Sequence, residues 1–222
     1  MLKFPLLLIN LKTYRESTGA NASAIARAAE LAAQKTGASI CVAAQALDLA
    51  QVASLVKIPV IAQHVDAEEY GKHTGYILPA EVLSHGARGT LLNHSEHKLS
   101  FPLLKKTIEL CKQVNLPVIV CCTTVKEAKR IDKLHPDCIL LEQPELISGT
   151  ISVAQAKPEL ILSAVQVVSS PILCGAGVNN AADVNAALRF GTQGVGLSNA
   201  VCSAKNPYEK ILELARALVR CE

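Results

Sequence analysis

The chain has 222 residues, half of them hydrophobic, with 22 basic and 19 acidic residues and a net charge of +3. This length fits one α/β barrel, and we predict a single domain over residues 1–222. Lys and Arg form no dense cluster of the kind that binds nucleic acid. No run reaches the ~18 apolar residues of a membrane span. We therefore expect a chain that binds neither nucleic acid nor a membrane.

The eight cysteines do not have the spacing of a disulfide framework or a metal site. No CxxC pair occurs, and the six histidines form no HExxH or similar pattern, so we expect no metal. The apolar run 4–11 is too short and too polar at its end for a secretory signal. A reduced, cytoplasmic protein is the expectation. Five cysteines fall in strand-like apolar runs, where a free thiol behaves as a small hydrophobe: Cys41, Cys121, Cys122, Cys138 and Cys174.

Strand-like apolar runs alternate with helical patterns along the whole chain. The alternation predicts a closed parallel (β/α)8 barrel with right-handed crossovers, and an open doubly wound sheet is the alternative. Apolar residues follow helical spacing in 101–114 and again near the C-terminus, where Asn206 and Pro207 form a helix start. The strand-like runs are 6–11, 38–44, 58–63, 88–92, 116–122, 137–142, 171–174 and 194–197.

Two connections, 64–78 and 143–157, are longer than the others. Long loops in a compact domain usually serve binding or assembly. We therefore expect each of these segments to take part in the site or in contacts with other chains.

Polar side chains stand at the ends of three strand-like runs, where a parallel β/α protein builds its active site. Asn10 and Lys12 follow the first run, His94 the fourth and Glu142 the sixth. Ser95 is a candidate N-cap, which would place the imidazole at a helix N-terminus and favour its neutral form. A cation, an imidazole and a carboxylate together can remove a carbon-bound proton and stabilise the resulting oxyanion.

Two further segments suit a phosphate group. Gly175-Ala176-Gly177 follows the seventh run, and 194–199 contains the eighth. Loops after strands seven and eight of such barrels often present backbone amides to phosphate.

Taken together, these motifs closely resemble the triosephosphate isomerase family in its short archaeal form. The resemblance covers nearly the whole chain, in the same order and spacing. Its motifs are Asn10-Leu11-Lys12, Asn93-His94-Ser95-Glu96, Glu142-Gln143-Pro144-Glu145-Leu146-Ile147 and Cys174-Gly175-Ala176-Gly177.

The resemblance implies a TIM barrel that interconverts dihydroxyacetone phosphate and D-glyceraldehyde 3-phosphate, in glycolysis and gluconeogenesis, without a cofactor. It implies Glu142 as the general base, His94 as the electrophile, and Lys12 with Asn10 as groups that bind substrate and stabilise the oxyanion. It also implies a mobile lid over 143–150 and a homotetramer or homodimer. Four further residues would bind the phosphate end of the substrate: Ile147, Gly177, Ser198 and Asn199.

The departures from the family pattern lie at the lid and the phosphate end. Gln143 stands where the family usually has Pro, Ser148-Gly149-Thr150 replaces a Gly-Thr-Gly or Gly-Ser-Gly, and Asn199 replaces a Ser. Two other functions remain open on the residues alone. One is a class I aldolase that uses Lys12 as a Schiff-base nucleophile, and the other is an inactive phosphosugar-binding barrel.

Overall fold

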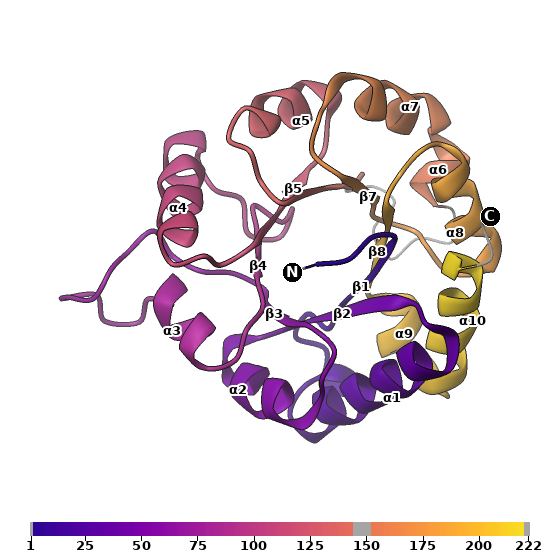
Figure 1. Cartoon of the computed structure of the whole chain (residues 1–222), viewed down its shortest axis with the longest axis horizontal. Coiled ribbons are helices and arrows are strands. Elements are labelled where there is room, and N and C mark those ends of the chain that lie inside the picture. The colour runs from indigo at the N-terminus through magenta and orange to yellow at the C-terminus, as the bar shows by residue number, and fades with distance from the viewer. Residues whose placement is uncertain (1, 144–151, 220–222) are drawn as a thin grey trace.

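A computed structural model describes residues 2–143 and 152–219. Within them, eight parallel strands close into a barrel in the order β1 to β8, with the helices outside (Figure 1). Each predicted run contains one strand, so the predicted closed barrel is confirmed and the open sheet is wrong. The strands are β1 (Leu6–Asn10), β2 (Ser39–Ala44), β3 (Val60–Ala62), β4 (Thr90–Leu92), β5 (Val118–Cys122), β6 (Cys138–Leu141), β7 (Ile172–Cys174) and β8 (Gly194–Leu197).

The helices pack around the barrel and agree with the two helical patterns found in the sequence. At the start of the last helix, Asn206 Oδ1 accepts a hydrogen bond from the Glu209 N–H (3.3 Å), as expected for an N-cap. The helices are α1 (Ala20–Thr36), α2 (Ala46–Leu55), α3 (Pro79–Ser84), α4 (Phe101–Gln113), α5 (Val125–Asp132), α6 (Val153–Ala156), α7 (Pro158–Val167), α8 (Ala181–Arg189), α9 (Asn199–Cys202), α10 (Pro207–Val219) and the 3-10 turn η1 (Arg15–Ser17).

Two apolar layers hold the barrel together, because successive strand residues point to opposite faces. In β1, Leu6 and Leu8 belong to a cluster inside the barrel, whereas Leu7 and Ile9 pack under the helices. The same alternation separates Cys121, which is inside, from Cys122, which is outside. The inner cluster also contains Cys41, Ala43, Ile61, Leu91, Ile119, Cys138, Leu140 and Leu173.

The barrel closes where β8 pairs with β1, and Gly194 makes this pairing possible. Gly194 lies opposite Leu6 and has a φ of 132°. A β-carbon at Gly194 would lie 2.1 Å from the Leu6 carbonyl oxygen. Only glycine therefore allows the two strands to approach at this point.

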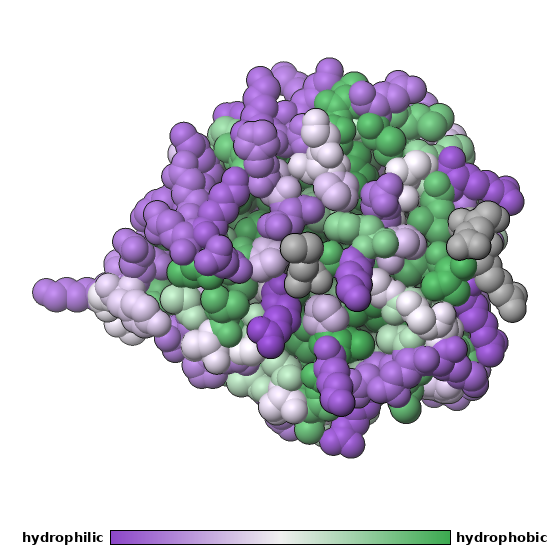
Figure 2. All heavy atoms as spheres, in the orientation of Figure 1, coloured by the Kyte–Doolittle hydropathy of each residue, from purple (hydrophilic) through white to green (hydrophobic). Residues whose placement is uncertain are grey.

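The N-terminal segment covers one opening of the barrel (Figure 1). Leu2 is buried in the inner cluster, and Phe4 packs against it. Seen from this side, the surface mixes hydrophilic and hydrophobic side chains, and one segment projects from the body (Figure 2). The strand ends that carry the candidate site face the opposite opening.

The projecting segment is the connection from β3 to α3, the first of the two long loops predicted from the sequence. Two hydrogen bonds close its base: the Asp66 N–H donates to the Ile77 carbonyl (2.8 Å), and the Ile77 N–H donates to Asp66 Oδ2 (2.7 Å). Tyr70 and Tyr76 are exposed on it.

In the second predicted connection, 143–157, the described part contains the helix α6. Of the predicted lid 143–150, only Gln143 belongs to the described part of the chain. Among the described helices, none combines the length and the apolar character needed to cross a membrane.

Candidate active site

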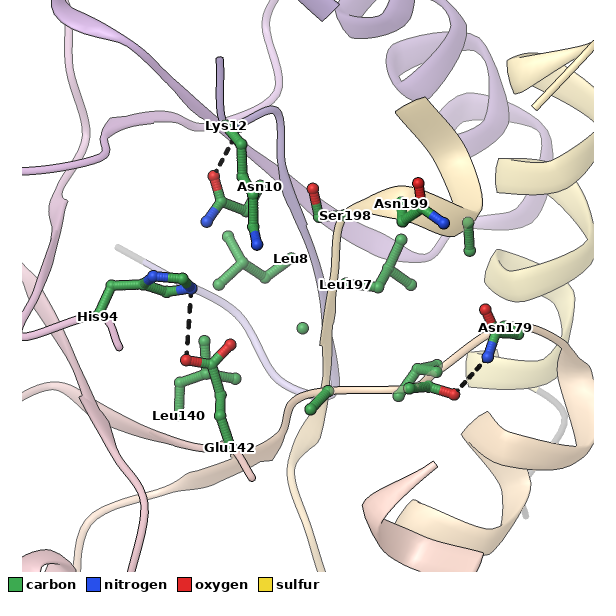
Figure 3. A pocket seen from close by; sticks show the side chains of 15 residues that line it. Leu8, Asn10, Lys12, His94, Leu140, Glu142, Asn179, Leu197, Ser198 and Asn199 are labelled. Atoms are coloured by element: carbon green, nitrogen blue, oxygen red, sulfur yellow. Dashed lines mark hydrogen bonds and ion pairs between the residues drawn. The ribbon is translucent and has the colours of Figure 1, made fainter. Parts of the chain in front are cut away.

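The polar residues at the strand ends line one pocket at the carboxyl end of the barrel (Figure 3). Asn10 is the last residue of β1, and Lys12 follows it in the loop; His94 lies two residues after β4, and Glu142 directly follows β6. The pocket has a volume of about 510 Å³ including its open mouth, and Leu8 and Leu140 are among its apolar lining residues. Lys12 and His94 are 82 residues apart in the chain, and His94 and Glu142 are 48 residues apart, so distant segments meet here.

His94 and Glu142 face each other across this pocket. The distance from His94 Nε2 to Glu142 Oε2 is 3.4 Å, and both side chains are about nine-tenths buried, with 9% and 10% exposed. Glu142 Oε2 is buried and has no hydrogen-bond partner in the structure. A buried carboxylate oxygen without a donor is costly, and it is available to a proton from a bound molecule.

The hydrogen bonds of His94 fix which ring nitrogen carries the proton. The backbone N–H of Glu96 donates to His94 Nδ1 (3.2 Å). A nitrogen that accepts a hydrogen bond is not protonated, so the neutral imidazole carries its proton on Nε2 and directs it into the pocket.

The turn that holds His94 differs from the predicted one. The His97 N–H donates to the His94 carbonyl (2.8 Å), which closes a turn, and α4 begins only at Phe101 with Ser100 as its N-cap. The prediction of Ser95 as N-cap is therefore wrong, and its buried hydroxyl has no partner. The hydrogen bond from the Glu96 N–H, and not a helix N-terminus, sets the tautomer of the neutral imidazole.

Lys12 directs its ammonium group into the same pocket (Figure 3). Its backbone lies in the left-handed region (φ 50°), and its N–H donates to Asn10 Oδ1 (3.0 Å). Non-glycine residues rarely adopt this conformation, which occurs in turns and is common at functional sites. Lys12 Nζ also donates to Glu96 Oε1 (2.6 Å).

Glu96 is a site residue to which the sequence analysis gave no role. It provides the backbone N–H for His94 and the carboxylate for Lys12. Its position two residues after His94 was visible in the motif, but only the turn brings its side chain to Lys12.

The opposite wall of the pocket contains Gly177, Ser198 and Asn199, the three described residues that were predicted to bind the phosphate end of the substrate. Ala176 and Gly177, which both line the pocket, have left-handed backbones (φ 65° and 70°). The Asn199 side chain accepts a hydrogen bond from the Ser203 hydroxyl (2.7 Å). Ile147, the fourth residue predicted for this end, lies outside the described residues.

Neither metal nor thiol chemistry is indicated by the described residues. Within residues 2–143 and 152–219, no group of three or more His, Cys, Asp and Glu side chains could hold a metal ion. Burial raises the pKa of the thiols of Cys111 and Cys174 to about 12. The pocket instead combines a carboxylate, an Nε2–H donor and an ammonium group, which suits proton transfer next to a carbonyl.

Comparisons with known proteins show which family the chain resembles over nearly its whole length. The family model described as triosephosphate isomerase matches residues 5–217. Triosephosphate isomerases of Pyrobaculum calidifontis and Methanocaldococcus jannaschii are 42% and 41% identical, over 98% and 95% of this chain and 98% and 99% of their own lengths. The crystal structure of triosephosphate isomerase from Bartonella henselae superposes with a TM-score of 0.73, at 13% identity, over 97% of this chain and 99% of that one. This chain belongs to the triosephosphate isomerase family.

Proposed function

We propose that the chain is an aldose–ketose isomerase that interconverts dihydroxyacetone phosphate and D-glyceraldehyde 3-phosphate in glycolysis and gluconeogenesis. The observation that carries the proposal is the pair of buried side chains at the strand ends: Glu142 Oε2 forms no hydrogen bond and lies 3.4 Å from His94 Nε2. Family membership supports the choice of substrate.

In the proposed reaction, Glu142 removes a proton from the carbon next to the substrate carbonyl. The C–H electron pair forms the C=C bond of an enediolate, and the carbonyl oxygen takes the negative charge. The protonated Glu142 then returns the proton to the neighbouring carbon, and a hydroxyl proton moves between the two oxygens. General-base catalysis of this kind contributes roughly 10²–10⁴-fold.

The negative charge on oxygen would be stabilised by His94 and Lys12. The Nε2–H of His94 points into the pocket, and Lys12 Nζ lines it beside Asn10. Each well-placed donor to an oxyanion contributes about 10²–10³-fold. The reaction needs no metal ion or organic cofactor.

The phosphate group would lie against Gly177, Ser198 and Asn199, with Ile147 as a further contact taken from the family resemblance. A phosphate held rigidly also limits a side reaction, because an enediolate beside a phosphate ester can expel phosphate. Binding energy from this remote group can support catalysis at the reacting carbons.

The experiment that tests the proposal is an isomerase assay with D-glyceraldehyde 3-phosphate and a coupling enzyme that consumes dihydroxyacetone phosphate. We expect turnover by the wild type, strong loss in Glu142→Gln, and loss of turnover as well as affinity with glyceraldehyde, which lacks the phosphate. An inactive wild type would support a binding protein instead.

Lys12 is poorly suited to the aldolase alternative. Its ammonium group donates to the Glu96 carboxylate at 2.6 Å, whereas a Schiff base forms from a free amine. Borohydride treatment in the presence of the substrate should therefore leave Lys12 unmodified.

We further propose that the chain works in the cytoplasm as a homodimer or homotetramer. The family resemblance suggests this, and the exposed Tyr70 and Tyr76 on the projecting segment are suitable contacts. Sedimentation of the purified chain would give the mass of the assembly, and a monomer at all concentrations would contradict the proposal.

A further inference from the structure

Gln143 directly follows the proposed base, and its side chain is buried. Its Nε2 donates to the Thr123 carbonyl (2.5 Å), just beyond the end of β5. Its Oε1 accepts a hydrogen bond from the ammonium group of Lys157 (3.0 Å), at the start of α7. The amide thus joins the end of β6 to two other elements through both of its polar atoms.

Thr123 continues these contacts to the next turn. Its backbone N–H and its hydroxyl both donate to Glu127 Oε2, at 2.9 and 3.1 Å. Glu127 Oε1 accepts from Asn93 Nδ2 and from Lys98 Nζ, both at 3.0 Å. Burial alone would raise the pKa of Glu127, but the hydrogen bonds from Thr123, Lys98 and Asn93 hold this pKa below its usual value.

Asn93 ends this series directly before His94. It is buried with a left-handed backbone (φ 60°). Its Nδ2 also donates to the Cys121 carbonyl (2.9 Å), and its Oδ1 accepts from the Leu99 N–H (3.0 Å). The side chain thus helps to define the turn from which the imidazole projects.

The carboxylate of Glu142 lacks such support of its own. Its Oε2 forms no hydrogen bond and lies 3.4 Å from His94 Nε2, so its position depends also on the backbone on either side. The Glu142 N–H donates to the Cys122 carbonyl (2.9 Å) on one side. On the other side, the side chain of Gln143 is the next anchor.

We propose that the polar chain Lys157–Gln143–Thr123–Glu127–Asn93 fixes the position of the Glu142 carboxylate relative to the His94 imidazole. Gln143 and Glu127 are its positioning residues. Gln143 lies one residue after the base, and Asn93, at the other end of the polar chain, lies one residue before the imidazole. Charged groups take part near both ends, and such charge-assisted hydrogen bonds are stronger than neutral ones. The inference rests on the proposed isomerase function.

Three variants test the polar chain. Gln143→Met keeps the length of the side chain but removes both hydrogen bonds, Glu127→Gln keeps the shape but removes the charge, and the third variant combines them. The measurements are kcat, KM, and the isotope effect of a substrate deuterated at the carbon that loses its proton. Gln45→Met is the control, because it removes a similar hydrogen bond to Asp48 (2.8 Å) at the end of β2.

We expect each single variant to lose about tenfold in kcat, since displacements below ~1 Å already slow proton transfer. KM should change less than about threefold, because the residues proposed to bind the phosphate are unchanged. The isotope effect should rise, because proton removal becomes slower. The kcat of the double variant should lie within about threefold of the kcat of the slower single variant, as expected for residues that act in one network. Gln45→Met should keep the wild-type kcat and isotope effect.

Other outcomes separate the two proposals. If the wild type is active and Gln143→Met keeps its kcat and isotope effect, the polar chain does not position the base. The same conclusion would follow if the losses in kcat of the two single variants multiply fully in the double variant. An inactive wild type would instead overturn the isomerase function. If Gln143→Met does not fold, Lys157→Met takes its place in the test and is judged by the same criteria. This variant removes the ammonium group that donates to the Gln143 amide.

Discussion

Gly175 and Glu142 are in contact at the floor of the site, and this contact leaves no room for a side chain at Gly175. A β-carbon at this position would lie 2.6 Å from Cγ of Glu142 and 3.0 Å from Cδ1 of Leu140. The Gly175 N–H donates to the Leu141 carbonyl (2.8 Å), so the backbone here cannot retreat without losing a strand hydrogen bond. Gly175 therefore defines the lower boundary of the space that the carboxylate occupies.

Gly175→Ala should displace the Glu142 carboxylate away from its present position. Because a shift of ~1 Å in a reacting group can cost on the order of 10²-fold, we expect kcat to fall between about tenfold and a hundredfold. Coupled isomerase assays would measure this loss.

Gly37→Ala is the matched control for this prediction. Gly37 ends α1 with a φ of 77°, and nothing lies within 4 Å of its missing β-carbon. The substitution should therefore destabilise the fold by about 1 kcal/mol through backbone strain but leave kcat unchanged. Equal losses of activity in both variants would mean that Gly175 acts only through stability.

Glu142→Asp should keep the charge of the base but withdraw the carboxylate by one methylene group. The expected loss in kcat is on the order of 10²-fold, with a much smaller change in KM, because binding of the phosphate end is unaffected. Steady-state assays in both directions would test this. A loss below threefold would remove Glu142 from the role of the base.

The buried cysteines should not react with alkylating reagents in the folded chain. Burial raises the pKa of Cys111 and Cys174 to about 12, and it also raises the pKa of the Cys41 and Cys121 thiols. Since the thiolate is the reactive form, iodoacetamide at neutral pH should label these residues only after unfolding. Peptide mass mapping would locate the label, and rapid labelling of any of the four in the native state would contradict the buried positions.

The barrel could be predicted from the sequence because the strands are buried on both faces. Their signal is a continuous apolar run, and β6 is an example, since all four residues from Cys138 to Leu141 are buried. The ends of the strands differ more from the prediction: β3 covers only Val60–Ala62 of the expected run 58–63. Strand ends depend on pairing with neighbours, which a single segment does not specify.

The site could be predicted only where strand order determines it. Lys12, His94 and Glu142 come together because carboxyl ends of parallel strands meet at one opening. The contact of Glu96 with Lys12 and the hydrogen bonds of Gln143 depend instead on turn geometry and side-chain rotamers. The predicted N-cap at Ser95 fails for the same reason, since the helix starts later, after Ser100.

Asp132 should make the stability of the chain depend on pH in the acid range. It lies at the end of α5 and accepts hydrogen bonds from the N–H groups of Ser169 and Ser170, at 3.0 and 2.9 Å, and from the Ser170 hydroxyl at 2.7 Å. Burial by itself would raise the pKa of Asp132, but these hydrogen bonds and the charge of His135 hold it below the usual value. A lowered pKa in the folded state means that the stabilisation is complete above the unfolded pKa of ~3.9 and is lost as the pH falls through the folded value.

Asp132→Asn should therefore unfold at lower urea concentration than the wild type at pH 7, and the difference should shrink progressively below about pH 4. Ser170→Ala removes one of the donors and should give a smaller difference with the same pH dependence. If the difference between the wild type and Asp132→Asn stays constant from pH 7 to the acid range, the charge of Asp132 does not stabilise the fold. In that case the contact between α5 and the segment before β7 would depend on the shape of the side chain and not on its ionisation.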